Sequence, residues 1–84
     1  MIVDGRVQGV FFRATCAARA RERGLSGWIR NLPDGGVEAV FEGGEDDVEA
    51  LVGWCGVGPD GARVDRLERT VEAPTGEPGF RIQG

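Results

Sequence analysis

Apolar and polar residues alternate along several segments of this 84-residue chain, and a two-residue period is typical of β-strands with one buried face. The turn cluster Pro33–Gly36 separates two such segments, which predicts a β-hairpin. The alternation is imperfect after residue 63, which indicates a β-bulge there. Five segments are expected to be strands, with a Pro- and Gly-containing loop at Ala73–Gly79: Met1–Val7, Ser26–Leu32, Val37–Glu42, Arg63–Glu72 and Phe80–Ile82.

The segment Arg13–Arg23 has the composition and spacing of an amphipathic helix. It is rich in Ala and contains no Gly or Pro, and Gly24 follows it, where helices commonly end. Small side chains share one of its faces, at Cys16, Ala17 and Ala20. We therefore expect this helix to lie close against a sheet.

A second helix is predicted at Asp46–Cys55, where apolar residues recur at positions 48, 51, 52 and 55. Three consecutive acidic residues, Glu45 to Asp47, stand at its start. Negative charge is favoured near a helix N-terminus, so we interpret this run as a helix start and not as a metal site.

The predicted order is β-α-β-β-α-β, with the short last strand either extra or part of the strand before it. This order indicates an α+β fold of the ferredoxin-like, split βαβ type, in which two helices cover one face of a mainly antiparallel sheet. The length allows one domain, residues 1–84. Five aromatic residues are expected to form much of the core: Phe12, Trp28, Phe41, Trp54 and Phe80.

The composition excludes several kinds of chemistry. The chain has no His, Lys or Tyr, which excludes a His-based catalytic triad, a Schiff-base lysine and a P-loop lysine. No C-x-x-C motif is present, so no zinc ribbon is expected, and Cys16 and Cys55 are predicted to be reduced and buried. The chain has no stretch of 18 apolar residues and no signal-peptide pattern, so we expect a cytoplasmic protein without a membrane anchor.

The net charge of −4 conceals a division between two parts of the chain. Residues 1–31 carry six Arg and two acidic residues, a net +4, whereas residues 32–84 carry four Arg and twelve acidic residues, a net −8. Nucleic-acid binding requires a broad basic face, so it is not expected here. The basic part could still bind a small anion, although most of its Arg side chains are expected to be solvated helix surface.

A Gly-containing turn connects the first strand to the first helix. Glycine allows the backbone of such a turn to approach a ligand closely, and consecutive N–H groups next to a helix N-terminus can bind an anion. Arg13, predicted at the first helical position, could add bidentate hydrogen bonds. On spacing alone, a Gly-containing segment between a strand and a helix is more often a simple turn. The candidate anion-binding residues are Gln8, Gly9, Val10, Phe11, Phe12 and Arg13.

Asn31 is the second candidate, near the end of the predicted strand and just before the turn cluster. A carboxamide can both accept and donate a hydrogen bond, so it could hold a water molecule for attack on a bound substrate. The alternative is that Asn31 only caps the turn.

The two candidates lie in motifs that resemble those of the acylphosphatase family. The residues Gly5–Arg13, GRVQGVFFR, resemble its first signature, and Gly27–Asn31, GWIRN, followed by Asp34 and Gly35, resemble its second. The resemblance covers nearly the whole chain, with further matches at Val37–Ala39, Trp54, Gly58–Pro59, Ala62–Val64 and Gly79–Ile82.

The resemblance implies hydrolysis of the carboxyl–phosphate bond of small acyl phosphates, giving a carboxylate and inorganic phosphate. We expect the phosphate product to inhibit the enzyme as well. It assigns phosphate binding to the loop and Arg13, and orientation of the attacking water to Asn31, with no metal, cofactor or covalent intermediate. A phosphate oxygen of the substrate is our candidate acceptor for the water proton. A monomer without nucleic-acid or membrane partners is expected.

Two alternatives stay open at this point. A catalytically idle binding or regulatory module could have the same fold. A single-strand RNA binder would need exposed aromatics and a basic sheet face, and Glu38 and Glu42 argue against it. Only Met1–Asp4 precede Gly5, fewer residues than family members usually have, and a shortened interior strand would bear on stability more than on chemistry.

Overall fold

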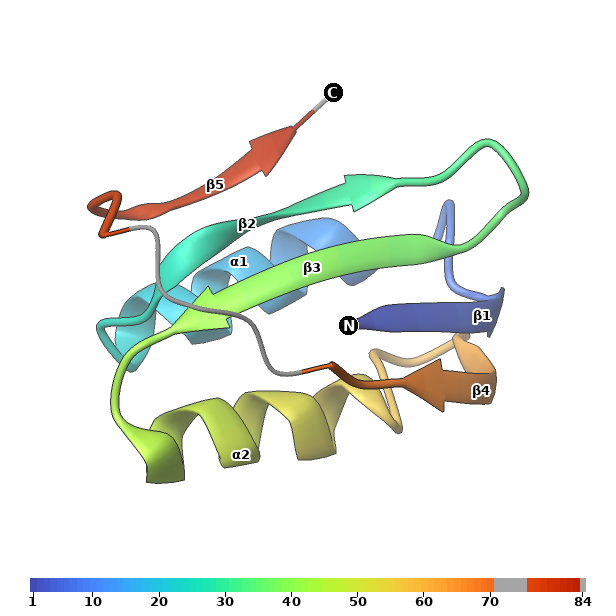
Figure 1. Ribbon diagram of the computed structural model, residues 1–84. Helices are drawn as coiled ribbons and strands as arrows, with labels where there is room; N and C mark the ends of the chain where they lie inside the picture. The colour runs from blue at the N-terminus through green and yellow to red at the C-terminus, as the bar shows by residue number, and fades with distance from the viewer. Residues whose placement is uncertain (71–75, 84) are drawn as a thin grey trace.

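The computed structural model describes residues 1–70 and 76–83 and shows two helices against a five-stranded sheet (Figure 1). The strands lie in the order β4-β1-β3-β2-β5, and all pairs are antiparallel except the parallel pair of β2 and β5. The ferredoxin-like α+β fold is thereby confirmed, with the last strand as a separate edge strand. The element bounds are β1 Ile2–Arg6, α1 Phe12–Glu22, β2 Ser26–Asn31, β3 Val37–Glu42, α2 Glu45–Cys55, β4 Arg63–Glu68 and β5 Phe80–Gln83.

The hairpin of β2 and β3 forms as predicted, with Ser26 opposite Glu42 and Asn31 opposite Val37. The predicted bulge is also confirmed: the register of β1 against β4 shifts between Asp4 and Gly5, leaving one extra residue on β4. The strand expected to reach residue 72 ends at Glu68. Residues 71–75, which include the end of that expected strand and the start of the expected loop at 73–79, lie outside the described residues.

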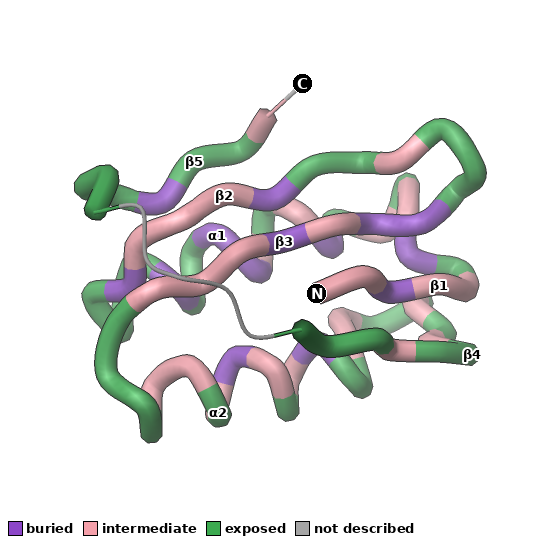
Figure 2. The backbone as a smooth tube through the Cα atoms, in the orientation of Figure 1, coloured by how far each residue is buried: buried purple, intermediate pink, exposed green. Residues whose placement is uncertain are grey.

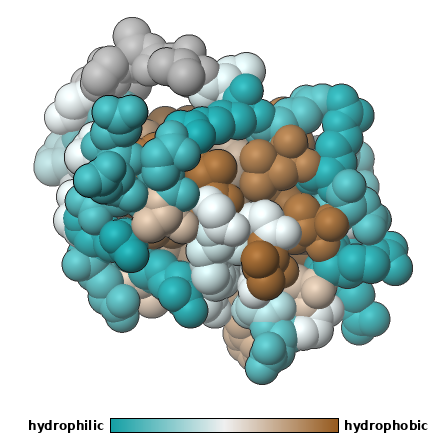
Figure 3. All heavy atoms as spheres, turned by 90° about the horizontal axis from the view of Figure 1, so that it is seen from below, coloured by the Kyte–Doolittle hydropathy of each residue, from teal (hydrophilic) through white to brown (hydrophobic). Residues whose placement is uncertain are grey.

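One hydrophobic core joins both helices to the same face of the sheet (Figure 2). Cys16, Ala17 and Ala20 of α1 are buried, which confirms the predicted close face of that helix. The core also includes Leu51 and Cys55 of α2. Seen from below Figure 1, hydrophobic side chains gather in the middle of a mainly hydrophilic surface (Figure 3).

Four of the five aromatic residues expected in the core are part of it or pack against it. Phe12 and Phe80 are buried, Trp54 lies 5.3 Å from Phe12 between ring centroids, and Phe41 stacks on Phe80 at 5.5 Å. The prediction for Trp28 was wrong. Side chains alternate along a strand, and because Ile29 faces the core, Trp28 lies on the opposite face, where Arg30 covers its ring.

Among the described residues, neither helix has the length and apolar character of a membrane-spanning segment.

The helices and strands bring the N-terminus of α1 next to the ends of β2 and β5. Arg21 of α1 donates two hydrogen bonds to the carbonyl of Phe80, at 3.1 and 2.9 Å, and so fastens β5 to the helix. Arg21 therefore has a structural contact where a solvated side chain was expected.

Candidate active site

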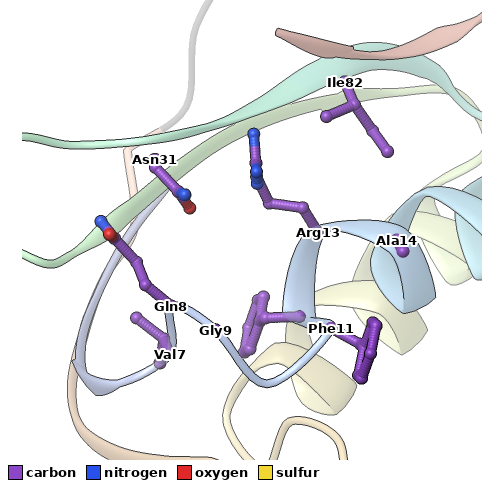
Figure 4. A pocket seen from close by; sticks show the side chains of 9 residues that line it. Val7, Gln8, Gly9, Phe11, Arg13, Ala14, Asn31 and Ile82 are labelled. Carbon is purple, nitrogen blue, oxygen red and sulfur yellow. The ribbon is translucent and has the colours of Figure 1, made fainter. Parts of the chain in front are cut away.

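A pocket of about 270 Å³ lies where the loop after β1, the first turn of α1 and the ends of β2 and β5 meet (Figure 4). It brings Arg13 and Asn31 together, which are 18 residues apart in sequence on different elements. Five of the six candidate loop residues line the pocket, and the side chain of Val10 instead packs against the core. The lining residues are Val7, Gln8, Gly9, Phe11, Phe12, Arg13, Ala14, Asn31 and Ile82.

The backbone of the loop offers a set of free hydrogen-bond donors. Within the described part of the chain, no N–H group from Gln8 to Arg13 donates a hydrogen bond. Helix α1 begins at Phe12, one residue earlier than predicted, so the first N–H groups of the helix join those of the loop. The positive end of the helix dipole lies at the same place, and the combination favours a bound anion.

Two residues of the loop have left-handed backbone conformations. Gly9 has a φ of 74°, and a Cβ atom added there would meet no neighbour within 4 Å. Phe11 has a φ of 60°, which is uncommon for an aromatic residue and costs about 1 kcal/mol. This pair of conformations turns the chain from the loop into α1.

The half-buried guanidinium of Arg13 lies in the middle of the pocket (Figure 4). Its Nη1 donates to the main-chain carbonyl of Gln83 at 3.2 Å. This contact joins α1 to the last strand and orients the guanidinium, which keeps further N–H groups for a ligand. No acidic side chain lines the pocket, so the charge of Arg13 acts there without a counter-ion from the lining residues.

Asn31 is the last residue of β2, and it lies on the same side of Arg13 as Gln8 in Figure 4. Among the described residues its carboxamide has no hydrogen-bond partner, so it remains available to a bound water. The turn-capping alternative does not hold, because the carboxylate of Asp34 performs this role by accepting from Gly36 N–H at 2.9 Å.

Gln8 contributes a contact that the sequence did not predict. Its Nε2 donates to the carbonyls of Leu32 and Gly36, both at 2.8 Å, and so ties the loop to the β2–β3 turn. Ala14 and Ile82 also line the pocket without having been predicted. Ile82 could not be placed from local patterns, because its position depends on the parallel pairing of β5 with β2.

The described residues contain no group of three or more His, Cys, Asp or Glu that is arranged to hold a metal ion. The polar groups at the pocket are the backbone N–H groups of the loop, the guanidinium of Arg13 and the carboxamides of Gln8 and Asn31. These groups suit the binding of a small, doubly charged anion and the placing of a water molecule beside it.

Comparison with known proteins agrees with the motifs. Residues 1–82 match the family model described as acylphosphatase. The acylphosphatase of Natronomonas pharaonis is 52% identical over 96% of this chain and 88% of its own, and that of Thermococcus kodakarensis is 55% identical over 98% and 90%.

Solved structures show the same relationship. The crystal structure of acylphosphatase from Bacillus subtilis is 37% identical, covers 99% of this chain and 93% of its own, and superimposes with a TM-score of 0.93. A part of HypF from T. kodakarensis also matches, with 40% identity and a TM-score of 0.78, over 98% of this chain but 12% of that one. The signatures around Arg13 and Asn31, the fold and these comparisons establish that the chain belongs to the acylphosphatase family.

Proposed function

We propose that this acylphosphatase hydrolyses small acyl phosphates with the residues of the pocket alone, Arg13 and the loop binding the phosphate and Asn31 placing the attacking water. The observation that carries the proposal is that loop N–H groups and an Asn31 carboxamide, which have no partner among the described residues, meet the Arg13 guanidinium in one pocket. Acyl phosphate hydrolysis itself follows from family membership.

In the proposed mechanism the dianionic phosphate enters the loop and accepts hydrogen bonds from its N–H groups. Arg13 adds charge-assisted bonds to the phosphate oxygens, and these bonds stabilise charge that develops on the equatorial oxygens in the transition state. The donors are fixed by α1 and by the contact with Gln83, so little reorganisation is needed during the reaction.

Asn31 holds a water molecule on one side of the phosphorus atom. The water oxygen forms a bond to phosphorus, and the bond from phosphorus to the carboxyl oxygen breaks on the opposite side. The electron pair of that bond leaves with the carboxylate, and the water proton passes to a phosphate oxygen. A carboxylate is a good leaving group, so positioning and charge stabilisation are sufficient and no strong base is required.

Substitution at the two residues tests the roles. Arg13→Gln and Asn31→Ala should each lower kcat/KM for benzoyl phosphate by about 100-fold or more, while the far-UV circular dichroism is preserved. Arg23→Gln is a matched control, because Arg23 pairs with Asp47 on the surface and does not line the pocket. Full turnover by Asn31→Ala would contradict its role in placing the water.

Inorganic phosphate provides a separate test of the anion site. It should inhibit competitively at millimolar concentration, and the inhibition should weaken as salt screens the charge of Arg13. Arg13→Gln should lose this inhibition. If phosphate does not inhibit the unaltered protein, the loop is not the anion site.

We also propose that the protein acts as a monomer in the cytoplasm. The candidate residues Arg13 and Asn31 and the loop that would bind the phosphate all come from this one chain. Cys16 and Cys55 are both buried free thiols, which suits a reducing compartment. Light scattering of the purified protein should give the mass of one chain, and the mass of a dimer would contradict the proposed monomer.

A further inference from the structure

The pocket is divided into a polar and an apolar side. In Figure 4, Gln8 and Asn31 lie on one side of Arg13, with the buried Val7 beside Gln8, and Phe11, Ala14 and Ile82 lie on the other. The apolar side includes two of the three large hydrophobic side chains that are exposed among the described residues, Phe11 at 81% and Ile82 at 42%.

Phe11 has two features that are unfavourable in the free protein. Its aromatic ring remains in water, and its backbone holds the left-handed conformation with a φ of 60°. The left-handed backbone turns the chain into α1, but the exposed ring is not needed to pack the core, because Phe11 is not part of it. A ligand that covers the ring would recover the apolar surface, and the position of the ring at the pocket indicates where such a ligand lies.

The geometry of the reaction selects the same side. In an in-line displacement the attacking and leaving oxygens lie on opposite sides of the phosphorus atom. When Asn31 holds the water on the polar side, the leaving carboxylate and its substituent must extend away from Asn31. That direction leads to Phe11, Ala14 and Ile82.

We propose that Phe11 and Ile82 bind the acyl group of the substrate and make the enzyme selective for acyl phosphates with an apolar, branched or aromatic substituent. This proposal rests on the proposed function of the same pocket. The contact exists before and during bond breaking alike, so it should lower KM more than it raises kcat.

The test compares acetyl phosphate, 3-methylbutanoyl phosphate and succinyl phosphate. The leaving carboxylates of the first two have nearly the same acidity, so a difference between them reports binding of the substituent. We expect kcat/KM for 3-methylbutanoyl phosphate to exceed that for acetyl phosphate by about tenfold, mainly through KM. Succinyl phosphate should be the poorest of the three, because its second carboxylate would lose solvation against the apolar side.

Two variants connect the preference to the residues. Ile82→Thr keeps the β-branched shape, and Phe11→Asn keeps a residue that tolerates the left-handed conformation. Each should lower the ratio of the two kcat/KM values several-fold. Val57→Thr is the matched control, because Val57 is the third exposed large hydrophobic residue, at 72%, and does not line the pocket. Its ratio should stay as in the unaltered protein.

The outcomes separate this proposal from the proposed function. Equal kcat/KM and KM values for all three substrates, or a ratio unaltered in both Ile82→Thr and Phe11→Asn, would overturn the acyl-group assignment while hydrolysis itself stood. Hydrolysis of none of the three would overturn the proposed function, and the selectivity that depends on it.

Discussion

The amide of Gln8 is joined to the residue that follows the candidate water-binding Asn31: Gln8 Nε2 donates to the carbonyl of Leu32 at 2.8 Å. The same nitrogen donates to the carbonyl of Gly36 at 2.8 Å. Because both partners are carbonyl oxygens, the NH₂ group must face them. Gln8 thus fixes the distance between the candidate anion-binding loop and the end of β2, and hence between the two parts of the candidate site.

Replacement of Gln8 by Leu should therefore affect catalysis more than stability. Each carbonyl keeps one main-chain donor, Gly35 N–H for Leu32 and Leu32 N–H for Gly36, so the loss in free energy of unfolding should be about 1 kcal/mol. The value of kcat/KM for benzoyl phosphate should fall by 10-fold to roughly 100-fold, because the water and the phosphate lose their fixed relation. Urea unfolding and steady-state kinetics measure the two effects.

Asp34→Ala is the comparison for this variant. It removes the bond from Gly36 N–H within the same turn but leaves the link to the loop. It should lower stability by a similar amount with a smaller effect on kcat/KM. Equal losses of kcat/KM in both variants would mean that general loosening of the turn, and not the Gln8 link, controls the site.

The fold could be predicted from sequence to the extent that its patterns are local. The β2–β3 hairpin and the face of α1 follow from residues close together in the chain, and both are confirmed. The prediction for Trp28 failed because two neighbouring apolar residues in one strand cannot both face the core, and local composition does not say that Ile29 does. The parallel partner of β5 joins residues about 50 positions apart, and no local pattern encodes it.

The features of the candidate site can likewise be separated into local motifs and contacts between distant elements. The loop and Asn31 belong to contiguous motifs, so they could be chosen as candidates from sequence, and the structure brings them to one pocket. The link from Gln8 to the turn, the carbonyl of Gln83 and the apolar side at Ile82 arise where separate elements meet. These contacts depend on strand order, which a motif does not contain.

Gly5 should be irreplaceable for stability. Its φ is 133°, and a Cβ atom there would lie 2.1 Å from the carbonyl oxygen of Arg63 at the bulge. Gly5→Ala should therefore lower the free energy of unfolding by about 2–4 kcal/mol, as measured in urea. Gly53→Ala is the opposite case, because Gly53 lies inside α2 with open space around it. This substitution should raise the free energy of unfolding by about 0.5–1 kcal/mol. Similar effects of both substitutions would contradict the role of the bulge.

Arg21 should stabilise the last strand. Arg21→Ala removes both hydrogen bonds to the Phe80 carbonyl, and we expect a loss of about 1 kcal/mol with faster amide exchange in β5. Because β5 carries the carbonyl that accepts from Arg13, kcat/KM should fall as well. Arg23→Ala removes an exposed ion pair with Asp47 and should alter stability little. Unchanged exchange in β5 of Arg21→Ala would show that the strand is held by its pairing with β2 alone.

The buried thiol of Cys55 predicts a loss of stability at alkaline pH. The hydrogen bond with Cys16 raises the pKa of Cys55 above its ordinary value, and burial raises it further. The folded protein therefore keeps this proton at a pH where the unfolded chain releases it, from about pH 8.5 upward. The unfolded state then binds fewer protons than the folded state, so the free energy of unfolding must decrease as pH rises.

Few other groups contribute in this range, since the chain has no Lys, His or Tyr side chain. Urea unfolding at intervals between about pH 7.5 and 10.5 should therefore show a decline in the unaltered protein. The double variant Cys16→Ala, Cys55→Ala should be less stable at pH 7.5, because both side chains are buried in the core, but its stability should depend less on pH. The decline belongs to the thiols only if it is reduced in the double variant. An equal decline in both proteins would assign it to other groups, since the variant retains every ionisable group except these two.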